Sequence, residues 1–578
     1  MDYKAIYDYW LNDPYFDAAT RDELRSIGGD ENEIRERFYK NLEFGTGGLR
    51  GVIGAGVNRM NIYTVSRATQ GLCNYILKQK NANDTQPSSI AVAYDSRRFS
   101  KEFAVQTALV AAGNGIKAYI FPELAPTPML SYAVRKLNCA SGVVITASHN
   151  PPEYNGYKAY WSDGCQIPYP RDEEIIGEVN ALTSYADIKT TDRDEAERRG
   201  LFQVMPGYVA DDYIDTIKKL CININDIKQA AAELQIVYTP LNGTGAAPVK
   251  RVLGELGFVN VKIVPEQANP DPDFTTAKSP NPEDPRAFVL AKRLAVETGA
   301  DIIVATDPDA DRVGVVARNA AGDYEHLNGN MTGIILTEYL LSQMKRAGAL
   351  PVNPAIVSTI VSTKLTARIA NAYGAAYFDV LTGFKYIGGK IRDFEEQGGY
   401  NYVFGFEESF GYLPGMHARD KDGVASAMLV CETAAYYKQK GMTLFDALNE
   451  IYVKYGFYKE GIHTIFHEGI EGAKRIKSIM ADLRGRDAAR INGRKVLEID
   501  DYQTGYGKNT VTGSTVKLTL PVSDVMYYGL ENDYWFCARP SGTEPKIKIY
   551  FGVKTDSMER ADSELTQFMD DCLKFIGE

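Results

Sequence analysis

The segment that sets the fold class lies at residues 90–121 and reads IAVAY at 90–94, a helical stretch that closes near Gly115, and IKAYIF at 116–121. Two short β-rich runs joined by a helix are typical of a strand–helix–strand unit, and the crossover is long enough to join parallel strands. The same order recurs at residues 236–264, through Gly257, and at residues 355–380, through Gly374. The sequence therefore predicts three related α/β units.

The C-terminal part of the chain has a different texture. After about residue 456 the sequence becomes charged and helical, and then reads YWFCA at 534–538 and IKIYF at 547–551, which predicts a fourth domain of another kind. We expect domain boundaries at 1–205, 206–322, 323–455 and 456–578. Residues 187–199 are expected to form a surface connection or a solvated helix. The proline-rich residues 265–285 are expected to be irregular, because proline continues neither regular structure.

The composition places the chain among ordinary globular proteins. It has 578 residues, 44% of them hydrophobic, and a formal net charge of −11, so several domains are expected and a nucleic-acid partner is not. An anionic substrate stays possible, because a few focused cations can override an acidic exterior. Seven scattered cysteines without a Cys-x-x-Cys pair indicate reduced thiols. The N-terminus lacks the pattern of a signal peptide and no apolar run has the length of a membrane span, so we expect a cytoplasmic protein without a membrane partner.

A candidate nucleophile lies in the run GVVITASHNPP at 142–152, where an apolar strand enters a loop that proline keeps from becoming helical. Ser148, between Ala147 and His149, is expected to be sterically open at the end of the strand. The later run NGYK at 155–158 brings the cation Lys158 after a tight turn. A serine that only caps the turn is the alternative.

A candidate metal site follows the apolar strand DIIVAT at 301–306, where the sequence continues DPDADR at 307–312. Three carboxylates so close together repel one another unless a hard cation neutralises them, and Mg²⁺ is the natural candidate. A calcium EF-hand is excluded, because it needs Gly and Glu where this chain has Arg312 and Arg318. An exposed acidic turn is the remaining alternative.

Two further runs carry polar groups suited to a phosphorylated sugar. In FGFEESFG at 404–411, Glu407 and Ser409 are two residues apart in an extended loop and can share a face toward sugar hydroxyls. In CARPSGTEP at 537–545, the Arg539 fork, two hydroxyls and a glycine that opens the backbone suit a phosphate. A solvated loop and an ordinary hairpin turn are the respective alternatives.

In this order, TASHNP at 146–151, DPDADR at 307–312, EES at 407–409 and RPSGT at 539–543 resemble the motifs of the α-D-phosphohexomutase family. GTGGLR at 45–50 is similar to the family's opening motif, whose arginine, here Arg50, lies in the active cleft. The resemblance extends from about residue 41 to near the end of the chain. It implies an α/β protein of three related mixed-sheet α/β domains plus a smaller α+β C-terminal domain, with one motif per domain facing a central cleft.

The resemblance also implies roles for individual residues. Ser148 would carry the phosphate and, with Asp307, Asp309 and Asp311, bind Mg²⁺; Arg50, His149 and Lys158 would be catalytic, and Lys158 and His149 are the candidates for general acid and base. Substrate contacts are expected from Arg312, Lys385, Glu407, Ser409 and the phosphate loop with Arg539, Ser541, Gly542 and Thr543.

The function implied by the resemblance is the interconversion of hexose 1-phosphate and hexose 6-phosphate through a phosphoserine and a hexose bisphosphate, with glucose 1,6-bisphosphate as activator. The EES run and the chain length resemble phosphoglucomutases of the type that includes phosphopentomutases, so a small phosphosugar, first of all glucose phosphate, is the expected substrate. Phe406 stands where many members have Gly, which leaves ribose and mannose phosphates open. A monomer or homodimer is expected. The distant alternatives are a phosphatase with Asp307 as nucleophile and a non-catalytic phosphosugar sensor.

Overall fold

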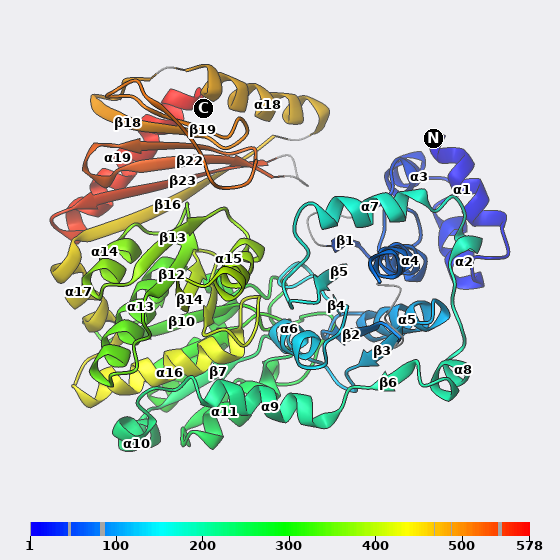
Figure 1. Ribbon diagram of the computed structural model, residues 1–578, viewed down its shortest axis with the longest axis horizontal. Helices are drawn as coiled ribbons and strands as arrows, with labels where there is room; N and C mark the ends of the chain where they lie inside the picture. Colours follow the sequence, from blue (N-terminus) through cyan, green and yellow to red (C-terminus); the bar gives the residue numbers. More distant parts are fainter. Residues whose placement is uncertain (1, 44–47, 81–86, 468, 487, 542–545) are drawn as a thin grey trace.

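Three short helices precede the first sheet in the computed structural model, which describes residues 2–43, 48–80, 87–467, 469–486, 488–541 and 546–578 (Figure 1). They are α1 (Tyr3–Asn12), α2 (Ala18–Ser26) and α3 (Glu31–Phe38). Each begins after an aspartate whose side chain accepts a backbone N–H of the first turn, as helix N-termini require. Trp10 stacks on Phe16 with ring centroids 4.2 Å apart, so an aromatic core holds these helices on the first α/β unit.

The first α/β unit is built on a six-stranded mixed sheet with the order β1-β5-β4-β2-β3-β6. Strands β4, β2, β3 and β6 run parallel, while β5 pairs antiparallel with β4 and β1 pairs antiparallel with β5. The strands are β1 (Gly48–Val52), β2 (Ser89–Tyr94), β3 (Lys117–Ile120), β4 (Ser141–Ile145), β5 (Tyr154–Trp161) and β6 (Phe202–Val204). The helices are α4 (Ile62–Gln79), α5 (Ser100–Gly113), α6 (Thr127–Lys136), α7 (Arg171–Ala181) and α8 (Arg193–Arg198), with the 3₁₀ turn η1 (Tyr185–Asp187).

The second unit has a five-stranded sheet with the order β11-β10-β9-β7-β8, in which β9, β7 and β8 are parallel. Its strands are β7 (Ile236–Thr239), β8 (Val261–Ile263), β9 (Ile302–Thr306), β10 (Val313–Arg318) and β11 (Tyr324–Leu327). Its helices are α9 (Gly207–Lys218), α10 (Ile224–Glu233), α11 (Ala246–Glu255) and α12 (Val289–Thr298). The proline-rich residues 265–285 are largely irregular as expected, except that 3₁₀ turns begin at two prolines, η2 (Pro265–Gln267) and η3 (Pro285–Phe288). Proline tolerates the first position of such a turn because that N–H needs no partner.

The third unit has a four-stranded sheet with the order β13-β12-β14-β15, in which only β15 is antiparallel. Its strands are β12 (Pro354–Thr359), β13 (Ala376–Val380), β14 (Asn401–Glu407) and β15 (Gly411–Pro414). Its helices are α13 (Gly329–Arg346), α14 (Leu365–Ala372), α15 (Phe384–Gln397), α16 (Gly423–Gln439) and α17 (Leu444–Tyr455). The buried helix α16 also packs on α10 and α11, so the second and third units share one hydrophobic core.

The three units share one order of connections, which confirms the predicted repeat. A central strand (β2, β7 or β12) pairs in parallel with the strand reached through α5, α11 or α14, and on its other side with a third strand (β4, β9 or β14). That third strand then turns into an antiparallel partner. The motifs that begin at Thr146, Asp307 and Glu407 lie at the end of this third strand, so the repeat places the three loops at equivalent points.

The C-terminal domain is an antiparallel sheet with the order β16-β23-β22-β21-β18-β19-β20, to which β17 adds by pairing with β18. Its strands are β16 (Phe457–Phe466), β17 (Arg490–Ile491), β18 (Arg494–Asp501), β19 (Tyr506–Asn509), β20 (Thr515–Lys517), β21 (Met526–Leu530), β22 (Trp535–Pro540) and β23 (Lys546–Thr555). Its helices are α18 (Gly469–Gly485) and α19 (Met558–Ile576), with the 3₁₀ turn η4 (Glu531–Asp533).

Alternate residues of β22 face opposite sides of the C-terminal sheet. Phe536 and Ala538 pack with residues of α18 and α19, whereas Trp535 and Cys537 pack with Ile360 and other residues of the third unit. This alternation is expected of a strand covered on both faces. It fixes which residues of β22 face the other domains.

Among the described residues, none of the helices is both long enough and apolar enough to span a bilayer.

Candidate active site

The loops after β4, β9 and β14 each contain a non-glycine residue with left-handed backbone. The φ angle is 52° at Ser148, 51° at Ala310 and 66° at Phe410. Such angles are uncommon for residues with a Cβ and persist only where the surroundings impose them. The repeat therefore supplies three strained turns at equivalent positions, and the first places a hydroxyl side chain at its strained residue.

A fully buried arginine holds the loop that carries Ser148. The Arg97 guanidinium donates hydrogen bonds to four carbonyl oxygens of this loop, those of Ser148, Asn150, Pro151 and Tyr154. Asp95 in turn lies 3.3 Å from Arg97 and accepts a 2.6 Å hydrogen bond from the Thr146 hydroxyl. Since both charged side chains are inaccessible to solvent, breaking either contact would leave a buried charge unpaired.

The Ser148 hydroxyl joins the first loop to the second. Its Oγ donates a 2.6 Å hydrogen bond to Asp307 Oδ2, across 159 residues of sequence, and lies 3.1 Å from His149 Nδ1. Ser148 was expected to be sterically open, but it is only 3% exposed, because the carboxylate loop lies directly against it. We call the meeting point of these two loops the serine–carboxylate junction.

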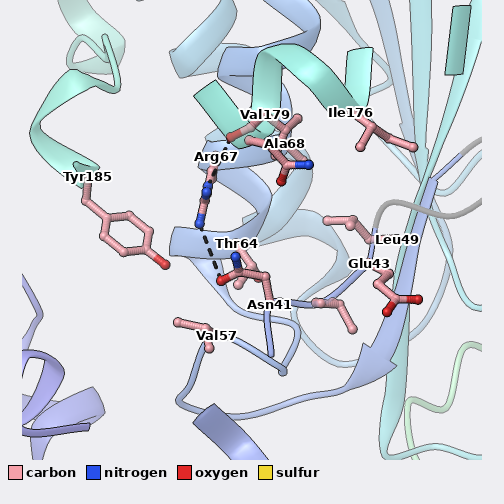
Figure 2. A pocket seen from close by; sticks show the side chains of 12 residues that line it. Asn41, Glu43, Leu49, Val57, Thr64, Arg67, Ala68, Ile176, Val179 and Tyr185 are labelled. Atoms are coloured by element: carbon pink, nitrogen blue, oxygen red, sulfur yellow. Dashed lines mark hydrogen bonds between the residues drawn. The ribbon is translucent and has the colours of Figure 1, made fainter. Parts of the chain in front are cut away.

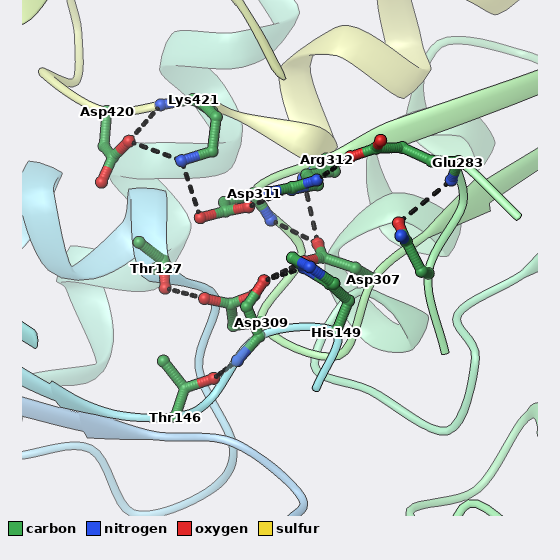
Figure 3. Close-up of polar contacts among 12 residues, drawn as sticks. Thr127, Thr146, His149, Glu283, Asp307, Asp309, Asp311, Arg312, Asp420 and Lys421 are labelled. Carbon is green, nitrogen blue, oxygen red and sulfur yellow. Dashed lines mark hydrogen bonds and ion pairs between the residues drawn. The ribbon is translucent and has the colours of Figure 1, made fainter. Parts of the chain in front are cut away.

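The carboxylates of Asp307, Asp309 and Asp311 come together in the junction, as the sequence predicts (Figure 3). Their ligand oxygens lie within 4.8 Å of one another, and all three residues are buried. Burial, and then repulsion from the other two carboxylates, raises the pKa of Asp307 well above its usual range. Asp309 Oδ1 and Asp311 Oδ1 are buried without a hydrogen-bond partner. Three converging carboxylates, two of which have an oxygen without a hydrogen-bond partner, fit a hard divalent cation such as Mg²⁺.

Two lysines from different units reach the same carboxylate oxygen. Lys158 of β5 lies 2.6 Å from Asp309 Oδ2 and 3.2 Å from Asp311 Oδ2, and Lys421 of the third unit lies 3.0 Å from Asp311 Oδ2. Burial alone would lower the pKa of Lys158, but Asp309 and Asp311 raise it above its ordinary value, and the pKa of Lys421 shifts in the same direction. Both side chains are therefore held as ammonium groups at the junction.

Sequence reasoning missed Lys421. It lies in RDKDG at 419–423, a charged segment that follows the sugar-loop motif and ends where the buried helix α16 begins. The position is fixed by a close approach, since Gly423 N donates a 3.0 Å hydrogen bond to the Ala310 carbonyl and a Cβ on Gly423 would lie 2.5 Å from that oxygen. Alternating charges before an apolar helix were the available signal.

Arg50 and His149, which were predicted to be catalytic, and Arg312, which was predicted to contact substrate, border the junction. Arg50 of β1 donates a 3.0 Å hydrogen bond from Nη1 to Asn150 Oδ1 in the serine loop. Arg312 pairs with Glu283, while its Nε lies 4.0 Å from Asp311 Oδ1. Burial, and then the nearby Arg312 and Arg50, holds the pKa of His149 well below its usual range. The imidazole beside Ser148 is consequently neutral.

The sugar-loop motif ends strand β14. Glu407 Oε1 accepts a 2.8 Å hydrogen bond from Gly383 N, and burial raises its pKa to about 7. Glu408 accepts a 3.0 Å hydrogen bond from the Thr359 hydroxyl, and Ser409 lies half-buried in the turn that follows. Lys385 is not at the junction: its Nζ lies 3.8 Å from Asp172 Oδ2, between the first and third units.

Arg539 lies on strand β22 of the C-terminal sheet. It is paired across the sheet with Lys548 of β23, and opposite residues of an antiparallel pair share one face. Arg539 shares that face with Trp535 and Cys537, so both cations lie on the side that packs on the third unit. Ser541 comes just after the end of β22, separated from Arg539 by Pro540, whereas Gly542 and Thr543 lie outside the described residues.

A pocket of about 270 Å³ in the first unit lies between α4, α7 and the segment before β1 (Figure 2). Arg67 crosses it and donates to the carbonyl oxygen of Val179 and to Asn41 Oδ1. Its lining includes none of the residues predicted for the site, so it takes no part in the chemistry considered below.

Repeated α/β units bring together a hydroxyl on a strained turn, three buried carboxylates and two ammonium groups. This arrangement suits metal-assisted phosphoryl transfer. Comparison with known proteins specifies the class. Models of the phosphoglucomutase/phosphomannomutase α/β/α domains I, II and III match residues 41–186, 211–322 and 328–455. The chain therefore belongs to the phosphoglucomutase/phosphomannomutase family, the α-D-phosphohexomutases, and is an isomerase.

Individual relatives agree with this assignment. A phosphoglucomutase of Staphylococcus aureus (strain MRSA252) is 37% identical over 522 residues, which cover 90% of this chain and 91% of the relative. A phosphoglucomutase of Staphylococcus haemolyticus (strain JCSC1435) is 36% identical, with 92% and 94% covered.

Two solved structures share the fold. The open form of pp63/parafusin, a phosphoglucomutase from Paramecium, has a TM-score of 0.68 at 18% identity, with 93% of this chain and 95% of that chain covered. A phosphoglucomutase/phosphomannomutase family protein from Burkholderia thailandensis has a TM-score of 0.64 at 20% identity, with 92% and 97% covered.

Proposed function

We propose that the enzyme interconverts glucose 1-phosphate and glucose 6-phosphate through a phosphorylated Ser148 and a glucose bisphosphate intermediate. The observation that carries the proposal is the 2.6 Å hydrogen bond from Ser148 Oγ to Asp307 Oδ2. It sets the hydroxyl of the strained residue Ser148 against the one group of carboxylates suited to a cation among the described residues.

The metal would be held by Asp307, Asp309 and Asp311, with Ser148 contributing through its hydroxyl or its phosphate oxygen. Mg²⁺ bound there supplies positive charge beside the phosphoryl group in transit. The protein adds the ammonium groups of Lys158 and Lys421, which are already in place before substrate binds. Fixed charge of this kind stabilises a transferring phosphoryl group without reorganisation during the reaction.

Transfer in the first direction moves the phosphoryl group from Ser148 Oγ to a free hydroxyl of the sugar phosphate. The bond from phosphorus to the serine oxygen breaks and the bond to the sugar oxygen forms. The proton of the sugar hydroxyl passes to the serine oxygen through the candidate acid and base, Lys158 and His149, so that a free Ser148 hydroxyl and a bisphosphate result. The second transfer returns the other phosphate to Ser148 after the bisphosphate has reversed its orientation. Arg97 keeps the serine loop in one position throughout, because its hydrogen bonds hold the loop carbonyls and not the hydroxyl.

Substrate recognition is assigned to the other two motifs. Glu407 and Ser409 would bind sugar hydroxyls, and Arg539 with Ser541, Gly542 and Thr543 would bind the phosphate that is not being transferred. Lys548, opposite Arg539, adds a second cation on the same face. Glucose is preferred over mannose and ribose because the relatives that align along most of the chain are phosphoglucomutases. Glucose 1,6-bisphosphate would serve as activator by phosphorylating Ser148.

A coupled assay tests this function. The purified enzyme is given the 1-phosphates of glucose, mannose, ribose and N-acetylglucosamine, each with and without Mg²⁺ and the matching bisphosphate. We expect turnover of every accepted substrate to require Mg²⁺, and kcat/KM to be highest for glucose 1-phosphate. A higher kcat/KM for ribose 1-phosphate would assign the enzyme to phosphopentomutase activity, and no turnover of any sugar phosphate would refute the proposal.

A further inference from the structure

A segment of the third unit, residues 415–423, lies against the first unit beside the junction. Within it, Asp420 Oδ2 accepts a 2.7 Å hydrogen bond from the Tyr160 hydroxyl. Tyr160 lies on β5 two residues after Lys158, and residues two apart on a strand face the same side of the sheet. On this face of β5, Lys158 therefore contacts the carboxylate loop and Tyr160 contacts Asp420.

The other oxygen of Asp420 holds Lys421. Asp420 Oδ1 accepts hydrogen bonds from the backbone N–H of Lys421 at 2.8 Å and from its Nζ at 3.2 Å. The same Nζ lies 3.0 Å from Asp311 Oδ2. Lys421 is thus shared between two carboxylates, and its position depends on how strongly each attracts it. Asp420 is only 3% exposed, so solvent contributes little to this balance.

The Tyr160 hydroxyl sets that balance by engaging one oxygen of Asp420. Tyr160 is fully buried, and burial followed by the charge of Asp420 raises its pKa well above the usual range. The phenol consequently stays protonated and remains a donor. A carboxylate that accepts a hydrogen bond on one oxygen has less negative charge to offer the cation at its other oxygen.

We infer that Tyr160 is a positioning residue: its hydrogen bond to Asp420 limits the pull of Asp420 on Lys421 and so keeps the Lys421 ammonium group at Asp311. This inference rests on the proposed function for its catalytic consequence. Neither Tyr160 nor Asp420 touches the three clustered carboxylates or Ser148 in the described contacts. Both act through Lys421. The hydrogen bond from Tyr160 to Asp420 connects Lys421 to strand β5, which also carries Lys158.

The chain offers a matched control in Tyr213 of α9. Its hydroxyl is also buried, and it donates hydrogen bonds to both oxygens of Asp422 in the same segment, at 3.0 and 2.9 Å. Asp422 receives its remaining hydrogen bonds from Val424 N, Ala425 N and His417 Nε2. Tyr213 and Asp422 therefore secure the start of α16, and among the described contacts no hydrogen bond or ion pair joins their side chains to the Lys421 ammonium group.

The test compares Tyr160→Phe with Tyr213→Phe, each of which removes one buried hydroxyl. We expect kcat on glucose 1-phosphate to fall about tenfold in Tyr160→Phe with KM within twofold, because Lys421 acts on the group being transferred. Tyr213→Phe should keep kcat within twofold, although both variants lower the Tm. Equal kcat in the two variants would overturn the inference, since a merely structural role predicts the same loss for both.

Calorimetric titration with Mg²⁺ alone gives a readout that does not depend on turnover. Without the Tyr160 hydroxyl, Asp420 draws Lys421 away from Asp311, so Tyr160→Phe should bind Mg²⁺ about threefold more tightly. Asp420→Asn keeps an acceptor for Tyr160 but releases Lys421 toward Asp311, so it should bind Mg²⁺ more weakly.

The two readouts separate the inference from the proposed function. Opposite changes of Mg²⁺ affinity in an enzyme without mutase activity would support the positioning and refute the function. Unchanged affinity in both variants would refute the positioning, whatever the activity of the parent enzyme.

Discussion

The serine–carboxylate junction and the Arg539–Lys548 pair both concentrate charge, but the protein builds them in different ways. At the junction, Ser148 and the three clustered aspartates are at most 3% exposed, and hydrogen bonds and ion pairs reach them from three units of the chain. Arg539 and Lys548 are half-buried and lie opposite each other in a single sheet.

The difference corresponds to two tasks. Charges fixed by several units before substrate arrives suit the transfer of a bond, which tolerates little misplacement. A pair of long cationic side chains on one sheet suits the recognition of a phosphate that arrives in two orientations during one catalytic cycle. Substitutions at the junction should therefore lower kcat, and substitutions at the pair should raise KM.

Ser148→Ala should have the largest effect and abolish measurable mutase activity. No neighbouring side chain replaces the oxygen that accepts the phosphoryl group, and uncatalysed phosphate-monoester cleavage is slow enough to demand up to ~10²¹-fold acceleration. The fold should survive, because one lost hydroxyl leaves no large cavity. Activity would be measured in the coupled assay and folding by the Tm. Retained turnover in the folded variant would contradict the role of the serine.

Asp311→Asn should lower kcat at least a hundredfold, because it removes a metal ligand and the partner shared by Lys158 and Lys421. Asp301→Asn is the control. Asp301 directly precedes β9, the strand that leads into the carboxylate loop, but its side chain pairs with Lys438 at 2.8 Å, away from the junction. The control should keep kcat within twofold. If Asp311→Asn raised KM and left kcat unchanged, this carboxylate would serve substrate binding. The proposed difference between the junction and the Arg539–Lys548 pair would then be wrong.

Arg539→Ala should raise KM for glucose 1-phosphate about tenfold or more and leave kcat within a few-fold, because a charge-assisted hydrogen bond to phosphate is worth ~1.5–3 kcal/mol and persists through the reaction. Arg368→Ala is the control, because Arg368 pairs with Asp533 at 3.0 Å between the same two domains. An unchanged KM in Arg539→Ala would remove this residue from the phosphate site.

Glu407→Gln should have the smallest effect, a few-fold loss of kcat/KM with every accepted sugar phosphate, because the amide still bonds to hydroxyls. The more distinctive effect of this substitution is on the pH dependence of folding stability. Burial raises the pKa of Glu407 to about 7, so ionisation costs folding free energy as pH rises from the unfolded value near 4.5, and the full cost is present above pH 7. The variant should therefore exceed the parent's Tm at pH 8, and the difference should be much smaller at pH 5 and vanish below the unfolded pKa near 4.5. Equal Tm differences at both pH values would show that burial does not raise the pKa of Glu407.

The sequence predicts the parts of this molecule that depend on local pattern. The three strand–helix–strand units and the carboxylate loop after β9 follow from apolar runs and from charges at alternate positions. Residues 187–199 likewise form the end of a 3₁₀ turn and the short solvated helix α8, as expected.

Pairings across long stretches of sequence could not be read in the same way. Lys421 meets Asp311, and Tyr160 meets Asp420 across 260 residues, only because the first and third units approach each other. The substrate contacts expected of Arg312 and Lys385 stay predictions, and nothing in the sequence indicated that Arg312 pairs with Glu283 or that Lys385 lies beside Asp172. Such partners depend on how separate sheets pack, and no local pattern encodes that packing.

The central claim is that Ser148 carries the phosphoryl group, and mapping the phosphate by mass spectrometry tests it most directly. The purified enzyme is treated with glucose 1,6-bisphosphate, digested and compared with Ser148→Ala. We predict one acid-stable phosphate on Ser148 in the parent enzyme, restored by the bisphosphate after removal, and none in the variant. A hydroxylamine-labile phosphate on Asp307 would contradict the account and assign the chain to the aspartyl-nucleophile chemistry instead.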